Sequence, residues 1–148
     1  EYLDKTIEPG WVDKVMQLKD ILLRGKEARD QINILGDDGV PLEYHITFNK
    51  SEIIDFVILQ QDAFDKVDAS TPMKRQQYMV NKILDICNSE FRFDGFEEIG
   101  AYFKKIINIL KQMNYQEFKS EKFTSLEEQL NATLEERIVS ELETQAAG

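Results

Sequence analysis

The segment FEEIGAYFKKIINILKQM, residues 96–113, is the clearest helix in the chain. Its large apolar residues recur every three or four positions, which places them on one face of an α-helix. These residues are Phe96, Ile99, Phe103, Ile106, Leu110 and Met113. Asp94 stands just before the segment, where an aspartate commonly caps a helix. The segment predicts an amphipathic helix that buries its apolar face in a helical core.

The N-terminal half of the chain predicts two more helices. The first covers about residues 11–35 and ends at Gly36, because glycine commonly terminates a helix. Its apolar stripe consists of Trp11, Val15, Leu18, Leu22, Ile32 and Leu35. The second begins at Ser51 and ends at Gln60 or Gln61. It is apolar on most sides and is therefore expected to be buried.

The segment LEYHITFNK, residues 42–50, shows a different pattern. It follows a turn, residues 36–41, that contains two glycines, two aspartates and a proline. Apolar and polar residues then alternate, which is typical of a strand, although a single strand without a partner is unstable. We expect an extended excursion or a short hairpin near residues 40–48, with His45 on its outer side.

The C-terminal half predicts two further helices around the central one. Thr71 and Pro72 are suited to the N-terminus of a helix that continues to about Glu90. A last, peripheral helix follows Ser125, with Glu128 completing a capping box. Its stripe is Leu126, Leu130, Leu134, Ile138 and Leu142. The sum is a mainly all-α fold, a bundle of about five helices.

Composition limits the classes of partner. The 148 residues include 42% hydrophobic and 31% charged residues, as in ordinary globular proteins. The net charge of −10 argues against binding to nucleic acid or to anionic lipid, and favours a basic protein partner. No run approaches the roughly 18 apolar residues that a membrane-spanning helix needs, so no membrane insertion is expected.

Catalytic and metal-binding patterns are not found in the sequence. Cys87 is the single cysteine and lies in an apolar helical face, where a small buried side chain is expected. His45 is the single histidine, which makes a transition-metal site a poor prediction. Gly25-Lys26 is followed by Glu27 and lacks the upstream glycine of a phosphate-binding loop. We therefore expect the chain alone to be no enzyme and to hold no metal.

The segment QQDAFDKVD, residues 60–68, has two possible roles. Phe64 offers a ring face and the neighbouring amide groups could orient a flat, partly polar ligand. Local chemistry alone favours the other role, in which Phe64 packs the loop onto the core.

The order of these motifs resembles a known family. A long helix ending in ILGDDGVPLE is followed by a short apolar helix and then by QQDAFDKVD. This order is similar to the C-terminal helical domain of the catalytic A subunit of V-type (archaeal/bacterial-type) ATP synthases over about residues 11–113, and more distantly to the F-type beta subunit. The family motif QQ-x-AFD-x-VD is matched by Gln60, Gln61, Ala63, Phe64, Asp65, Val67 and Asp68. Residues 1–10 resemble the lead-in from a preceding nucleotide-binding domain, and residues 11–148 would form the C-terminal bundle.

The resemblance implies a nucleotide-binding role for the loop. The adenine wall would consist of Gln60, Gln61, Ala63 and Phe64. The intact subunit would bind ATP or ADP with magnesium and act as an ATP hydrolase or synthase coupled to proton or sodium transport. Its phosphate and magnesium ligands would belong to the preceding domain, so no cofactor is expected in this chain alone.

The resemblance also implies protein partners. A rotor-contacting tip would consist of Asp37, Asp38, Gly39, Val40, Pro41, Leu42 and Glu43. The partners would be the non-catalytic B subunit and the central-stalk (rotor) subunits, in a cytoplasmic complex peripheral to the membrane. The alternative is a free-standing acidic helical module that binds a partner helix in a groove.

Overall fold

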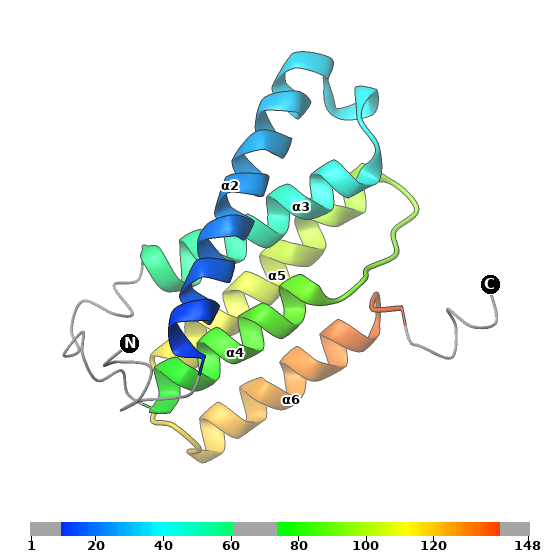
Figure 1. Ribbon diagram of the computed structural model, residues 1–148. Coiled ribbons are helices and arrows are strands. Elements are labelled where there is room, and N and C mark those ends of the chain that lie inside the picture. The colour runs from blue at the N-terminus through cyan, green and yellow to red at the C-terminus, as the bar shows by residue number, and fades with distance from the viewer. Residues whose placement is uncertain (1–9, 61–73, 140–148) are drawn as a thin grey trace.

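Figure 1 shows a computed structural model of the chain, which describes residues 10–60 and 74–139. Within these ranges the chain forms five α-helices, a 3₁₀ turn and a π-helical segment, so the all-α prediction is confirmed. The elements are α2 (Trp11–Leu35), η1 (Asp37–Gly39), α3 (Leu42–Ile53), η2 (Ile54–Leu59), α4 (Lys74–Asn88), α5 (Phe96–Asn114) and α6 (Glu121–Glu135).

Helix α2 has the bounds that its apolar stripe predicts. Trp11, Leu18 and Ile32 are buried, and the helix ends at Gly36. Gly36 has φ 88°, a backbone conformation that glycine adopts without strain. Its N–H donates to the carbonyl of Ile32 at 2.7 Å, which satisfies one of the last carbonyls of the helix.

The predicted extended excursion near residues 40–48 is wrong. The chain is helical from Leu42, so the second helix starts nine residues before the predicted Ser51. A helix satisfies the backbone groups of this segment internally, whereas a strand would need a partner. Ile53 and Ile54 both keep helical backbone angles, so α3 and η2 form one continuous rod, Leu42–Leu59.

Helix α5 lies at the centre of the core. Eight of its residues are buried, and they include the predicted stripe from Ile99 to Met113. It packs against α3, η2 and α6. Gly95, not the predicted Asp94, occupies the N-cap, and the Glu98 carboxylate accepts the N–H of Asp94 at 2.8 Å. This bond, together with Arg137, holds the pKa of Glu98 below its usual range.

Helix α6 begins earlier than predicted. Ser120, rather than Ser125, is the N-cap, and its hydroxyl accepts the N–H of Phe123 at 3.2 Å. The reason is that Phe123 is buried and extends the apolar stripe by one turn. The helix ends at Glu135, and Ile138 instead forms an antiparallel bridge with Phe91. Leu142 lies outside the described residues.

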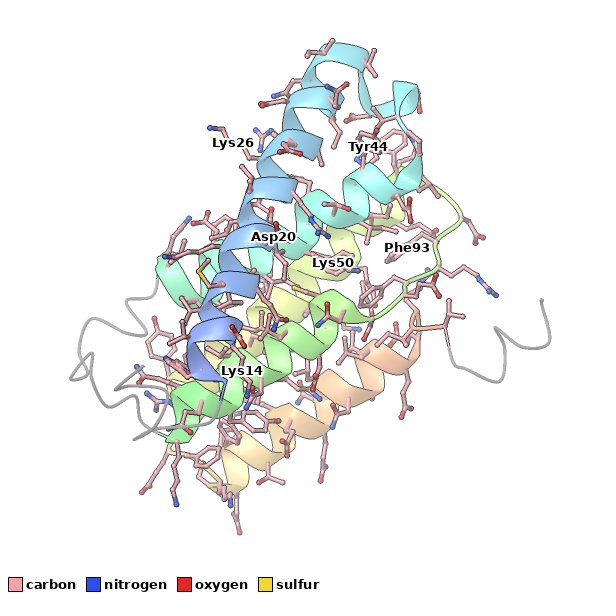
Figure 2. The ribbon with its side chains drawn as sticks, viewed as in Figure 1. Lys14, Asp20, Lys26, Tyr44, Lys50 and Phe93 are labelled. Carbon is pink, nitrogen blue, oxygen red and sulfur yellow. The ribbon has the colours of Figure 1, made fainter. Side chains whose placement is uncertain are left out.

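The α4–α5 connection is fastened to its neighbours on two sides. The Arg92 N–H donates to the Arg137 carbonyl at 2.9 Å, which ties it to the segment after α6. On the other side Lys50 of α3 points toward the connection, where its Nζ donates to the Ser89 carbonyl at 2.8 Å (Figure 2). Burial lowers the pKa of Lys50 from its ordinary value. Cys87 is buried as predicted, and burial raises the pKa of its thiol to about 12.

Helices α2 and α3 approach each other closely at Gly25. A Cβ atom at this position would lie 2.0 Å from Ser51 Oγ and 2.1 Å from Ser51 Cβ. Real Cβ atoms do not come this close to another heavy atom, so only glycine allows the observed crossing. The α2–α3 pair therefore depends on this residue.

Replacement of Gly25 by alanine is expected to lower the free energy of unfolding by about 1–3 kcal/mol, because overpacking displaces one helix from the other. Gly100→Ala is the matched control, since Gly100 is an exposed helical glycine and a Cβ atom added to it would meet no neighbouring atom. It should gain about 0.5–1 kcal/mol from helix propensity. Urea denaturation followed by circular dichroism measures both. Equal effects of the two changes would contradict the close crossing.

Candidate functional site

The rod Leu42–Leu59 has predicted site residues at both of its ends (Figure 1). One end carries the predicted rotor-contacting residues 37–43, here called the acidic tip. The other end leads into Gln60, the first residue of the predicted adenine wall. Gln61, Ala63 and Phe64 lie outside the described residues.

The acidic tip is a compact turn between α2 and α3. Two backbone bonds shape it: Gly39 N–H donates to Gly36 at 3.0 Å, and Tyr44 N–H donates to Pro41 at 3.1 Å. Its exposed residues are Asp37, Asp38, Gly39, Pro41 and Glu43; Leu42 is half-buried. Val40 is buried, so it anchors the turn instead of presenting a surface. The tip thus displays three carboxylates on a fixed backbone.

His45 holds the acidic tip against the body of the bundle. The sequence predicted a polar residue on an outer side, but His45 is buried with 7% of its surface exposed. Its Nε2 donates to the carbonyl of Asp37 at 2.9 Å. Its ring stacks on Phe96, the first residue of α5, with centroids 5.4 Å apart. A helical assignment of residues 42–53 would have found this role, because it places His45 on the face of Leu42, Ile46 and Ile53.

The far end of the rod is fixed by Gln60. Its N–H donates to the carbonyl of Asp55 at 2.8 Å, five residues earlier, as in a π-helix. Its side-chain amide Nε2 donates to the Asp55 carboxylate at 2.9 Å. Gln60 is exposed, so its amide oxygen can meet a polar ligand edge. This geometry is compatible with the polar edge of a base.

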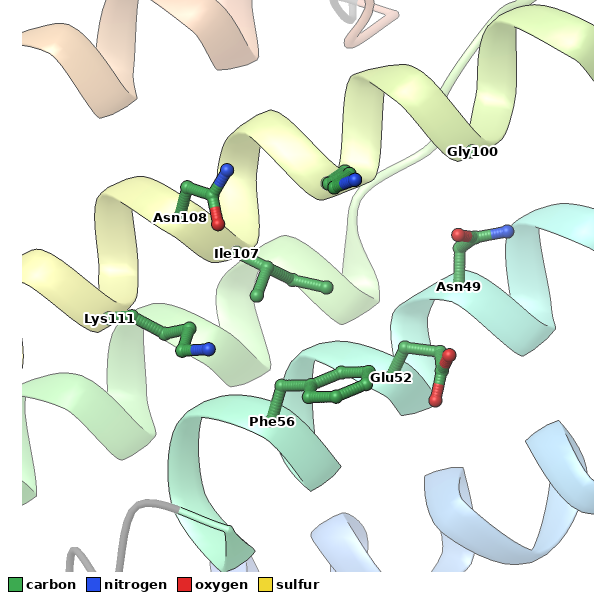
Figure 3. A pocket seen from close by; sticks show the side chains of 8 residues that line it. Asn49, Glu52, Phe56, Gly100, Ile107, Asn108 and Lys111 are labelled. Carbon is green, nitrogen blue, oxygen red and sulfur yellow. The ribbon is translucent and has the colours of Figure 1, made fainter.

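A hollow of about 320 Å³ lies along the rod, between it and α5 (Figure 3). Phe56 and Glu52 line it from the rod, and Ile107, Asn108 and Lys111 line it from α5. Lys111 Nζ lies 5.8 Å from the centre of the Phe56 ring. Burial and the nearby Asp55 raise the pKa of Glu52. The hollow brings together no catalytic constellation; it leaves one side of the rod only partly covered.

The described residues offer neither a metal site nor a membrane span. In residues 10–60 and 74–139, no group of three or more His, Cys, Asp or Glu side chains is placed to hold a metal ion. None of the helices in these ranges is long and apolar enough to cross a membrane.

Loss of the His45 ring should loosen the acidic tip. His45→Ala is expected to lower the free energy of unfolding by about 2 kcal/mol, since it removes both the stacking and the bond to Asp37. His45→Phe keeps the ring and should lose only about 1 kcal/mol. Tyr44→Ala, one residue away and 38% exposed, is the control and should change stability far less. Chemical denaturation provides the measurement. Wild-type stability in both His45 variants would show that the contact carries no energy.

The chain is similar in sequence to a protein family and to several known proteins. A family model described as the C-terminal domain of V and A type ATP synthase matches residues 1–91. The V-type ATP synthase alpha chain of Protochlamydia amoebophila is 31% identical over 128 residues, which cover 86% of this chain and 22% of that protein. The corresponding chain of Chlamydia trachomatis serovar L2 is 34% identical over 139 residues, or 94% of this chain and 23% of that protein.

A third relative, the V-type ATP synthase alpha chain of Borrelia duttonii, is 36% identical over 106 residues, which cover 72% of this chain and 18% of that protein. The chain thus spans about a fifth of the length of these relatives. No solved structure matches it. The family model ends at Phe91, before α5, while the Chlamydia relative extends the similarity over most of the chain. The resemblance seen in the motifs is therefore confirmed, and the chain belongs to the family of C-terminal domains of V- and A-type ATP synthases.

Proposed function

We propose that this domain serves the catalytic A subunit of a V-type rotary ATPase or ATP synthase by linking a nucleotide site to a rotor contact. The observation that carries the proposal is the continuous rod Leu42–Leu59, which joins the acidic tip to Gln60. The twelve residues of α3 and the six of η2 span roughly 25 Å. A single stiff element between two sites is what a mechanical link requires.

The loop that follows the rod would form one wall of the adenine pocket. Gln60, whose exposed amide is held by Asp55, would bind a polar edge of the base, with Gln61 and Ala63 beside it. Phe64 would lie against the face of the ring. The phosphate and magnesium ligands would belong to a nucleotide-binding domain before the lead-in, residues 1–10. The chain alone is then proposed to have no ATPase activity.

The acidic tip would contact a basic helix of the central stalk. The side chains of Asp37, Asp38 and Glu43 are exposed, so their negative charges are available to a basic partner. Ile34 and Leu35, at the end of α2, are 73% and 56% exposed and add an apolar surface next to these carboxylates. An amphipathic basic helix complements such a surface.

The rest of the complex follows from this assignment. The B subunit would complete the ring of nucleotide sites, and rotation of the stalk would couple ATP turnover to proton or sodium transport. The complex would be cytoplasmic and peripheral to the membrane. Displacement of the acidic tip would move the rod, and with it Gln60 at the nucleotide.

Phe64→Ala, in the full-length subunit assembled in its complex, is expected to raise the KM for ATP roughly tenfold, because stacking on a base contributes about 1–3 kcal/mol. Phe118→Ala is the control: Phe118 packs against Tyr78 and Phe123 in the bundle. It should lower thermal stability and leave KM unchanged. Steady-state ATPase assays measure the KM of both variants. A Phe64→Ala variant that loses stability with KM unchanged would assign the ring to packing.

Asp37→Asn with Asp38→Asn is expected to weaken binding of the central-stalk subunit a few-fold and to make that binding less sensitive to salt. The matched control is Asp13→Asn with Asp20→Asn, which removes the same charge from exposed positions on α2 nearer its N-terminus (Asp20 in Figure 2). Calorimetric titration at two ionic strengths measures both pairs. Equal losses in the two pairs would indicate a general effect of net charge and no specific tip contact.

A further inference from the structure

The last turn of η2 is held from outside by a side chain of α5. Val57 is fully buried, so water does not reach its carbonyl. A backbone carbonyl that is shielded from water needs a hydrogen-bond donor from the protein. Asn114, the last residue of α5, supplies one: its Nδ2 donates to the Val57 carbonyl at 3.0 Å.

This bond lies in a segment whose geometry determines the direction of Gln60. In η2 the Gln60 N–H bonds five residues back, to Asp55, and not four residues back, to Phe56. A π turn contains one residue more than an α turn, so conversion to α geometry would rotate the residue that follows by about 100°. The π turn is the rarer and less stable of the two, and contacts from outside η2 are needed to favour it.

The last turn of α5 provides such contacts at two points. Asn114 binds the Val57 carbonyl, and Lys111, one turn earlier, reaches over the Phe56 ring (Figure 3). Both contacts fall between Asp55 and Gln60, the two residues that close the π turn. The amide bond is the directional one, because it requires the carbonyl of Val57 at one place.

We propose that Asn114 is a positioning residue for nucleotide binding: it keeps η2 in the π geometry that directs Gln60 toward the base. This proposal rests on the proposed adenine wall. Asn114 itself contacts no nucleotide in this scheme and acts through Val57. A merely structural role for the bond would affect the stability of the fold and leave nucleotide affinity unchanged.

Asn114→Leu keeps the size of the side chain and removes the donor. In the full-length subunit within its complex, it is expected to raise the KM for ATP roughly three- to tenfold with kcat nearly unchanged. In the chain itself, the Gln60 amide should exchange its hydrogen faster by a larger factor than the Phe103 amide in the core, which reports global unfolding. Asn114→Asp keeps the shape of the side chain and also removes the donor, so it should change KM and the exchange at Gln60 in the same direction. It replaces the leucine variant as the test if that variant does not fold.

Asn108→Leu is the matched control, since it makes the same change at an exposed position of α5 that lines the hollow. It should alter neither KM nor the exchange at Gln60. An unchanged KM in both Asn114 variants, with a tenfold rise in Phe64→Ala, would overturn the role of Asn114 and leave the adenine wall intact. An unchanged KM in the Asn114 and Phe64 variants alike would overturn both proposals.

Discussion

The need to satisfy backbone hydrogen bonds in the segment Leu42–Leu59 determines most of what this domain can do. No strand lies beside it in the described residues, so the segment must pair its own N–H and C=O groups, and it does so as a helix. That helix is long enough to reach from the acidic tip to Gln60. Near one end the Asn114 side chain, from α5, donates to the buried carbonyl of Val57. Near the other end His45, itself a residue of the helix, donates to the Asp37 carbonyl of the acidic tip.

The acidic tip combines exposed negative charges with a well-anchored backbone. Mutual repulsion among the exposed carboxylates of the turn costs stability. The buried Val40 and the bond from His45 to Asp37 offset this cost by anchoring the turn. The close crossing at Gly25 and Ser51 keeps α2 against the rod, so both helices that enter the tip are fixed. The tip therefore presents its charges at a defined place, as the proposed contact with a rotor subunit would require.

Much of the fold was predictable from periodicity, because the stripes of α2 and α5 repeat over many turns and glycine marks the end of α2. The start of α3 could not be predicted in this way. Its apolar residues alternate with polar ones as in a strand, and only the absence of a partner strand argues against that assignment; these residues are Leu42, Tyr44, Ile46 and Phe48. His45 was missed for the same reason. The family motif predicted Gln60 as a site residue, but no sequence pattern pointed to Asn114. Its role depends on a contact between residues 57 positions apart and on a π turn that periodicity does not reveal.

In the proposed mechanism helix α5 takes part as well, although it lies beyond the match to the family model. Its first residue, Phe96, stacks on His45 near the acidic tip, and its last, Asn114, binds the far end of the rod. Its nineteen residues span about 28 Å, close to the length of the rod, and the two elements run parallel. A helix fastened to a second helix at both ends resists bending far more than either alone. We therefore expect a force on the tip to tilt the rod and α5 together. Because α3 would bend little, the displacement of the tip would be transmitted to Gln60.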